Sequence, residues 1–182
     1  MSKNKGKNYY IGKAGQLAVM SKLALRGYNI AIPEVDIGDD IFVVDDATGK
    51  LYRLQVKTRT AELQKKSQNY QTDFSIRIDQ ILDLKDPDLD YVFVTRFDDK
   101  DLLEFVIIPR REIETFMNEG FGSKDYSKDR KRPSMKYVFV FGKNERIVLG
   151  GRRNGAGGKD ITEYRNNWAK WPSILDQTLD TL

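Results

Sequence analysis

The chain has 182 residues, of which 40% are hydrophobic and 32% charged, and it contains neither cysteine nor histidine. This length suits one globular domain with a sizeable core. The two missing residue types exclude disulfides, thiol nucleophiles, imidazole catalysis and the common zinc sites. Any chemistry must therefore use carboxylate, hydroxyl, lysine or arginine groups. Among such chemistries, a hard cation such as Mg²⁺ held by oxygen ligands is the commonest way to act on a phosphate ester.

The hydropathy pattern indicates a protein that is not embedded in a membrane. No apolar run approaches the roughly 18 residues that a membrane span needs. The first seven residues are followed by a mixed polar segment instead of the apolar stretch of a secretory signal. We therefore expect a cytoplasmic protein that does not bind membranes.

Charge is distributed unevenly along the chain. Residues 1–29 carry six basic side chains and no acidic one, residues 30–119 carry twelve basic and twenty acidic, and residues 120–182 carry thirteen basic and seven acidic. Basic ends around an acidic middle predict a polyanionic partner held from the termini. Ordinary solvated faces would give the same charge pattern, so this alternative stays open.

The first elements are a tail and a helix. Residues 1–11 form a lysine-rich stretch that we expect to be a flexible basic arm, ahead of a single domain over 12–182. Within 13–26, apolar residues recur at helical spacing, which predicts a buried helix that Gly27 ends.

A hairpin follows. Strands are predicted over 28–32, 41–44 and 51–58, and the sequence Asp-Ala-Thr-Gly over 46–49 is typical of a hairpin loop. A loop centred there places Asp40 opposite Gln55. Strand alternation then puts Gln55 and Lys57 on one face and turns Leu54 and Val56 toward a core.

The rest of the chain is predicted to mix strands and helices. We expect loops at 59–72, 120–133 and 150–158, helices at 75–84, 110–118 and 160–169, and strands at 91–96, 103–108, 136–141 and 146–149. The aromatic residues Tyr164, Trp168 and Trp171 are expected to pack in the core rather than to stack on bases.

Three sequence features together resemble the PD-(D/E)XK nuclease superfamily. They are Gly15-Gln16 on the first helix, Asp36-Ile37-Gly38-Asp39-Asp40 at the start of a strand, and Gln55-Val56-Lys57 on the next strand. The resemblance covers about residues 12–97 and leaves 98–182 as a C-terminal extension. It implies a restriction-endonuclease-like α/β fold with an αβββαβ core, in which a central mixed sheet is flanked by helices.

The resemblance also implies roles for these residues. Asp40, the Gln55 side-chain oxygen and the Val56 carbonyl would bind the metal, and Lys57 would orient water or stabilise the transition state. Two amides, Gln55 and Gln16, stand where the superfamily usually has acids. We therefore expect one weakly bound ion, Mg²⁺ or Mn²⁺.

Supporting and DNA-binding residues are predicted outside this set. The residues expected to support the site are Gln16, Asp36 and Glu34. The side chains expected to contact the DNA backbone are Lys128, Arg130, Lys131, Arg132, Arg152 and Arg153. Solvated loops are the alternative for these basic residues, and the glycine-rich run over 150–158 lacks the spacing of a P-loop.

These features predict a metal-dependent endonuclease that acts on DNA. The alternative is a nuclease fold that has lost catalysis and serves as a nucleic-acid-binding or assembly module. Asp40 and Lys57 favour the first, whereas the two amides favour the second. An interaction domain without affinity for DNA is a third reading, and pairing into a homodimer, common among nucleases that cut both strands, is left open.

Overall fold

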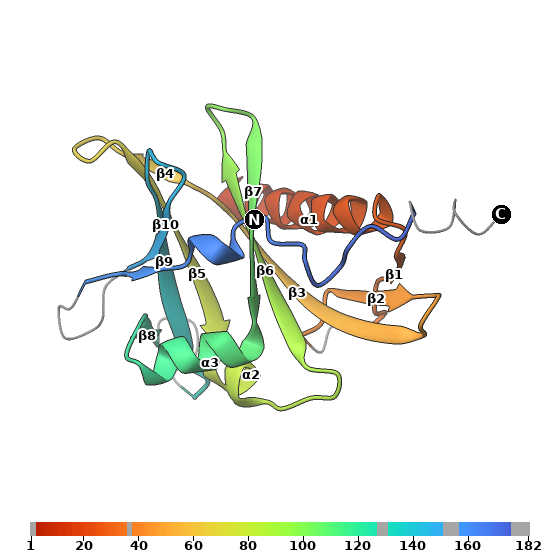
Figure 1. The fold of residues 1–182 in the computed structure, drawn as a ribbon. Helices are drawn as coiled ribbons and strands as arrows, with labels where there is room; N and C mark the ends of the chain where they lie inside the picture. The colour runs from red at the N-terminus through yellow and green to blue at the C-terminus, as the bar shows by residue number, and fades with distance from the viewer. Residues whose placement is uncertain (1–2, 36–37, 127–130, 151–156, 176–182) are drawn as a thin grey trace.

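The computed structural model describes residues 3–35, 38–126, 131–150 and 157–175, with side chains from residue 6 onward (Figure 1). The helices are α1 (Lys3–Ala24), α2 (Ile78–Leu82), α3 (Arg110–Asn118) and a 3-10 helix (Thr162–Tyr164). The strands are β1 (Asn29–Ala31), β2 (Ile41–Asp45), β3 (Lys50–Thr60), β4 (Glu62–Gln64), β5 (Asn69–Arg77), β6 (Leu89–Phe97), β7 (Leu102–Pro109), β8 (Ser123–Asp125), β9 (Ser134–Phe141), β10 (Ile147–Leu149) and β11 (Lys159–Asp160).

The central sheet is mixed. Its strand order is β1-β2-β3-β6-β7, and all neighbours are antiparallel except β3 and β6. That parallel pair requires a crossover, and the crossover carries α2. The path α1, β1, β2, β3, α2, β6 therefore follows the predicted αβββαβ order, with β4 and β5 inserted before α2, and the predicted fold class is confirmed.

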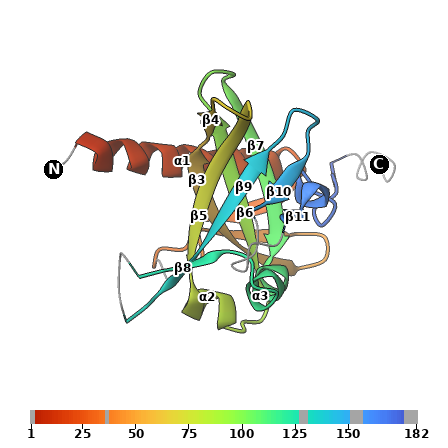
Figure 2. The same cartoon turned by 90° about the vertical axis from the view of Figure 1, so that its left-hand side faces the viewer.

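A second sheet packs against one face of the first. Its order is β11-β10-β9-β5-β4, with β8 paired to β9. Rings from both sheets meet between them, with Phe93 lying 4.9 Å from Phe74 and 5.1 Å from Phe139 between ring centroids. Helices α2 and α3 lie together at one end of this layer (Figures 1 and 2).

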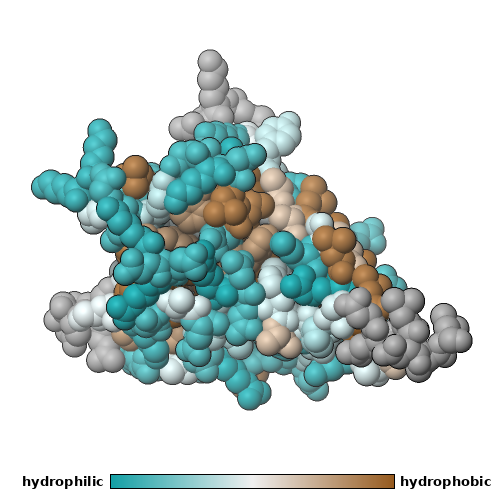
Figure 3. All heavy atoms as spheres, turned by 45° about the horizontal axis from the view of Figure 1, so that its top comes forward, coloured by the Kyte–Doolittle hydropathy of each residue, from teal (hydrophilic) through white to brown (hydrophobic). Residues whose placement is uncertain are grey.

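The other face of the central sheet is covered by α1 and the C-terminal segment. Val19 and Leu23 of α1 are fully buried there with Leu54. Trp168 and Trp171 belong to the same cluster, 8% and 0% exposed, which confirms that they pack in the core. The face of the molecule shown in Figure 3, with the top of Figure 1 turned forward, is mainly hydrophilic and has apolar side chains in separate patches.

Several predicted elements were wrong. The segment expected to be a loop over 59–72 forms the end of β3 and the β4–β5 hairpin, and β5 takes the first residues of the helix expected over 75–84. Helix α1 begins at Lys3, within the segment expected to be a basic arm, and it is buried on one side only, since Leu17 is 52% exposed.

The helix expected over 160–169 is replaced by β11 and a short 3-10 helix. Asp160 accepts a hydrogen bond from the Thr162 N–H at 2.9 Å, two residues ahead. The chain then turns at Asn166, which has a φ of +48°, and the Asn166 N–H donates to the Phe105 carbonyl at 2.7 Å. Long-range contacts thus override local helix propensity.

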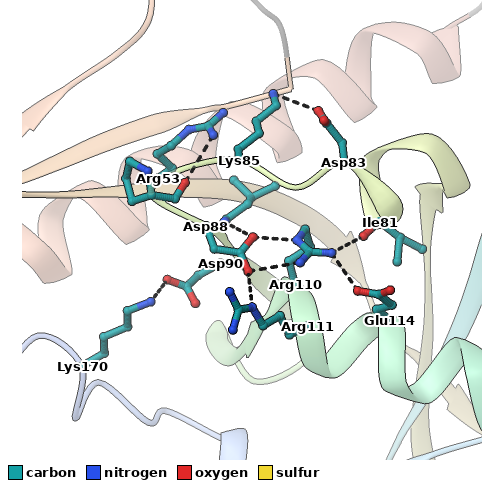
Figure 4. A network of polar contacts seen from close by, with 12 residues as sticks. Arg53, Ile81, Asp83, Lys85, Asp88, Asp90, Arg110, Arg111, Glu114 and Lys170 are labelled. Carbon is teal, nitrogen blue, oxygen red and sulfur yellow. Dashed lines mark hydrogen bonds and ion pairs between the residues drawn. The ribbon is translucent and has the colours of Figure 1, made fainter.

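A buried arginine joins α2, α3 and the start of β6 (Figure 4). Arg110 is 1% exposed and donates to Asp88 at 2.6 Å, to the Ile81 carbonyl at 2.5 Å and to Glu114 at 3.0 Å. These contacts hold α2, α3 and the residue before β6 together at the end of the crossover. None of the helices among the described residues is both long and apolar enough to cross a membrane.

Candidate functional site

The β2–β3 hairpin sets the geometry of the site. Ile41 lies opposite Leu54 and Val44 opposite Leu51, so the predicted register is confirmed. Gly49 closes the turn with a φ of +70°, a conformation that glycine adopts without strain. Just beyond the ladder, the Asp40 N–H donates to the Leu54 carbonyl at 2.8 Å, which brings Asp40 beside Gln55.

The Asp40 carboxylate is held against the next strand. Its Oδ2 accepts a hydrogen bond from the Val56 N–H at 2.7 Å. The β2–β3 ladder ends at Leu54, whereas β6 pairs with the other edge of β3 as far as Thr60. The carboxylate therefore caps the β3 edge at the middle of the Gln55-Val56-Lys57 triplet.

Gln55 and Lys57 share one face of β3, as predicted. Their neighbours on β6 are Tyr91 and Phe93, which belong to the core between the two sheets. Leu54 is buried on the opposite face, in the α1 cluster, and Val56 packs against it there.

Gln16 approaches Asp40 from α1. Its Nε2 donates to the Asp40 carbonyl at 2.7 Å, and its Oε1 accepts from the Lys13 ammonium at 2.8 Å. The helix comes close enough because residue 15 is glycine, since a β-carbon added there would lie 1.9 Å from Thr58 Oγ1. The predicted Gly15-Gln16 pair thus contacts the site, through the Asp40 backbone.

The Gln55 side chain lies in a tight buried space. It is 4% exposed, and its Oε1 has no hydrogen-bond partner within the described chain. Gly38, with a φ of +101°, leaves room for a second amide, because a β-carbon there would lie 2.7 Å from Gln80 Nε2 and 4.0 Å from Gln55 Nε2. Sequence reasoning missed Gln80, which α2 brings to the site through tertiary packing that no local spacing reveals.

Two grooves open beside these residues, one on each side of α1. The first, about 410 Å³, is lined by Tyr9, Lys13, Gln16 and Asp40 among others. The second, about 580 Å³, lies along β3 and β5 and contains Lys7, Lys57 and Arg59. Asn8 and Val56 line both grooves, so α1 forms the wall between them.

A buried ion pair supports the Asp40 backbone. Asp39 is 2% exposed and accepts a hydrogen bond from the Arg53 guanidinium of β3 at 2.5 Å. A carboxylate buried this deeply needs such a partner, because desolvation of an isolated charge is costly. The sequence places Asp39 in the segment at the start of a strand and does not indicate this role.

The other predicted residues are distributed as follows. Glu34 is exposed in the loop between β1 and β2, and Lys131 and Arg132 are exposed ahead of β9. The predicted residues outside the described ranges are Asp36, Lys128, Arg130, Arg152 and Arg153.

Where the structure describes it, the hairpin provides oxygen donors without an acidic cluster. No three acidic, histidine or cysteine side chains gather as a metal-binding group in the described part of the chain. The hairpin offers the Asp40 carboxylate, which accepts from the Val56 N–H, and the buried Gln55 amide oxygen, which lacks a hydrogen-bond partner among the described residues. Both are oxygen donors, the type that Mg²⁺ prefers.

Comparison with known proteins gives a structural likeness but no match in sequence. The sequence matches no known protein family and no curated protein. Among solved structures, the chain is similar to a bacterial homing endonuclease, I-Ssp6803I, with 18% sequence identity, a TM-score of 0.44 and coverage of 93% of each chain.

Proposed function

We propose that this chain is a metal-dependent nuclease that cleaves DNA phosphodiester bonds and whose site consists of Asp40, Gln55 and Lys57. It would be a variant of the PD-(D/E)XK type with glutamine in place of the second acid. One observation carries the proposal. The Asp40 carboxylate is fixed at 2.7 Å from the Val56 N–H, in the middle of the Gln55-Val56-Lys57 triplet on a rigid hairpin.

Asp40 and Gln55 would hold one Mg²⁺ or Mn²⁺, with the Val56 carbonyl as a further oxygen donor. The bound ion would neutralise charge on the phosphate group. Gln55 supplies a neutral oxygen where a carboxylate would supply an anionic one, so the site binds the ion weakly. Gln55 Oε1 supports this assignment because a buried acceptor without a partner is unfavourable.

Lys57 would supply a fixed positive charge from the groove along β3 and β5, which adjoins the groove that contains Asp40. In hydrolysis, a water oxygen forms a bond to phosphorus, the bond from phosphorus to one sugar oxygen breaks, and that oxygen takes up a proton. Negative charge grows on the phosphate oxygens during this exchange, and a preorganised cation stabilises it. The ammonium of Lys57 also orients the attacking water.

A second candidate function is a DNA-binding module without catalysis. The Gln16 amide favours it, because this side chain is already bonded to the Asp40 carbonyl and to Lys13. A site with amides at both positions has one firm anionic ligand. DNA binding would then persist without cleavage.

The test is metal-dependent cleavage of supercoiled, linear and branched DNA by the wild type and two variants. Asp40→Asn and Lys57→Ala should each reduce cleavage by about 100-fold or more, the usual effect of removing one electrostatic group from a site. Asp101→Asn and Lys100→Ala, in the exposed β6–β7 turn, are matched controls and should cleave as the wild type does.

Thermal melting of each variant establishes that it is folded. Full cleavage by folded Asp40→Asn or Lys57→Ala would refute the assignment. DNA binding by the wild type without cleavage in Mg²⁺ or Mn²⁺ would support the binding module instead.

A further inference from the structure

The first turns of α1 lie outside the body of the protein. Figure 2 shows the helix extending beyond both sheets toward its N-terminal end. All residues from Gly6 to Tyr10 are exposed, and Tyr9 and Tyr10 are 84% and 80% exposed. We call residues 6–13 the outer half of α1.

Residues 6–10 are exposed on every side of the helix, which is unusual for a segment with two adjacent tyrosines. A surface helix normally turns an apolar stripe toward its own domain and polar side chains toward water. Here two large aromatic side chains lie in solvent on adjacent positions, separated by about 100° around the helix axis. A partner that surrounds the helix would contact both.

The charge of this segment indicates the partner. The chain has no acidic residue before Glu34, whereas Lys7 and Lys13 are exposed on the outer half of α1. Lysines near the start of a helix oppose the helix dipole, and Gly6 and Gly12 weaken the helix further. Locally unfavourable residues of this kind are expected where binding requires them.

The outer half of α1 is continuous with the proposed site. Tyr9 and Lys13 line the groove that contains Asp40, and Lys7 lines the groove that contains Lys57. The grooves also contain the acids Glu62 and Asp73, and Asp73 is paired with Lys136 at 3.2 Å. A polyanion lying against α1 would therefore reach both grooves.

We propose that the outer half of α1 enters the major groove of duplex DNA and positions one strand over the site. A helix about 10–12 Å wide fits a major groove about 12 Å wide, which surrounds it on several sides. The Lys7 ammonium and the Tyr9 and Tyr10 hydroxyls are groups that commonly contact phosphates. This inference rests on the proposed function for its substrate but concerns binding alone.

The test measures duplex binding by the full chain in EDTA, where metal-dependent cleavage cannot occur. The double variant Tyr9→Ala/Tyr10→Ala should bind duplex DNA about ten-fold more weakly, through lost contacts to the groove walls. Lys7→Gln should reduce the slope of log K against log salt by about 1, because one phosphate contact is lost. The controls are Tyr126→Ala, whose tyrosine is 51% exposed beside β8, and Lys100→Gln.

Methylation of guanine N7 by dimethyl sulfate locates the groove, since N7 lies in the major groove. The wild type should protect guanines within its footprint, and the double tyrosine variant should lose that protection. Unchanged affinity in the tyrosine variant, or unprotected N7 atoms under bound wild type, would overturn the inference. A change in self-association instead of DNA affinity would also overturn it, by making a second copy the occupant.

Binding of duplex DNA through α1 and cleavage of DNA are tested by separate measurements, so either can fail alone. A chain that binds duplex DNA through α1 and never cuts it supports this inference and refutes catalysis. A chain that cuts DNA with unchanged kinetics and affinity after substitution of Tyr9 and Tyr10 refutes this inference alone.

Discussion

At the scale of single residues, Gly38 leaves room for the half-buried Gln80 amide near the buried Gln55 amide. Its φ of +101° lies in the left-handed region, and a β-carbon would lie 2.7 Å from Gln80 Nε2. Any side chain at this position therefore adds backbone strain and displaces Gln80.

Gly38→Ala should destabilise the protein slightly more than Gly49→Ala, because the end of the flexible Gln80 side chain must move. Both glycines have positive φ, so both substitutions cost about 1–3 kcal/mol of strain. Gly49 has open space around its added β-carbon, whereas Gly38 has the Gln80 amide. Denaturant unfolding of the two variants gives the difference, and Gly38→Ala/Gln80→Ala should reduce it. Equal losses from Gly38→Ala and Gly49→Ala would show that Gln80 does not pack there.

At the scale of elements, the contact of α1 with β3 depends on one glycine. A β-carbon at Gly15 would lie 1.9 Å from Thr58 Oγ1 and 2.8 Å from Thr58 Cβ, so the helix could not keep its position. This contact holds Gln16 at the Asp40 carbonyl. The geometry of the site thus depends on helix packing as well as on the hairpin.

Gly15→Ala should reduce the free energy of unfolding by about 1–3 kcal/mol, the usual cost of overpacking. Gly12→Ala is the matched control, because nothing lies within 4 Å of its added β-carbon. It should stabilise α1 by roughly 0.5–1 kcal/mol through helix propensity. Denaturant unfolding compares the two, and a Gly15→Ala variant as stable as the wild type would contradict this packing.

The contact between α3 and the start of β6 should respond to acid. Burial raises the pKa of the Asp88 carboxyl. Hydrogen bonds from Arg110, the Leu89 N–H and Arg111 lower it by more, so the net pKa lies below the ordinary value of 3.8. A depressed carboxyl pKa contributes stability that is present above the ordinary pKa and is lost as pH falls through the folded pKa.

Asp88→Asn should therefore show a shallower loss of stability below about pH 4 than the wild type shows. The measurement is the free energy of unfolding between pH 7 and pH 3. At neutral pH the variant should already be less stable, because Arg110 stays buried without its carboxylate partner. If the free energy of unfolding of Asp88→Asn fell as steeply below pH 4 as that of the wild type, the Asp88 carboxylate would not cause the acid sensitivity.

Sequence reasoning succeeded for elements that local signals determine. The β2–β3 hairpin has a turn that fixes its register, and α3 begins directly after Pro109, where the sequence predicted it. The segment 59–72 is polar, so its strands were missed. Its alternation becomes visible only with Thr72, Phe74 and Ile76, which face the core formed with β9.

At the scale of the whole molecule, one part of the site could be predicted and another could not. The Asp40–Gln55 neighbourhood follows from hairpin register, a local property. Gln80, the Asp39–Arg53 pair and the two grooves depend on the packing of α1 and α2 against the central sheet. No spacing in the sequence encodes those contacts.

The basic N-terminal stretch of the sequence lies beside the proposed site in the folded molecule. The acid-free N-terminal stretch becomes α1, which borders both grooves at the site. Of the basic residues predicted to contact DNA from the C-terminal part, Lys131 and Arg132 are exposed. Their contribution to DNA affinity stays a prediction.

The most direct test of the central claim is thermal melting of Gln55→Glu with and without Mg²⁺ or Mn²⁺. Without metal, the new carboxylate next to Asp40 should lower the melting temperature by repulsion. An ion at about 100 times its Kd stabilises the native state by about 2.7 kcal/mol, which is roughly 5–10 °C for a chain of this size. Metal should raise the melting temperature of Gln55→Glu more than that of the wild type or of Gln68→Glu in the β4–β5 turn. An equal response in all three proteins would contradict a metal site at Gln55.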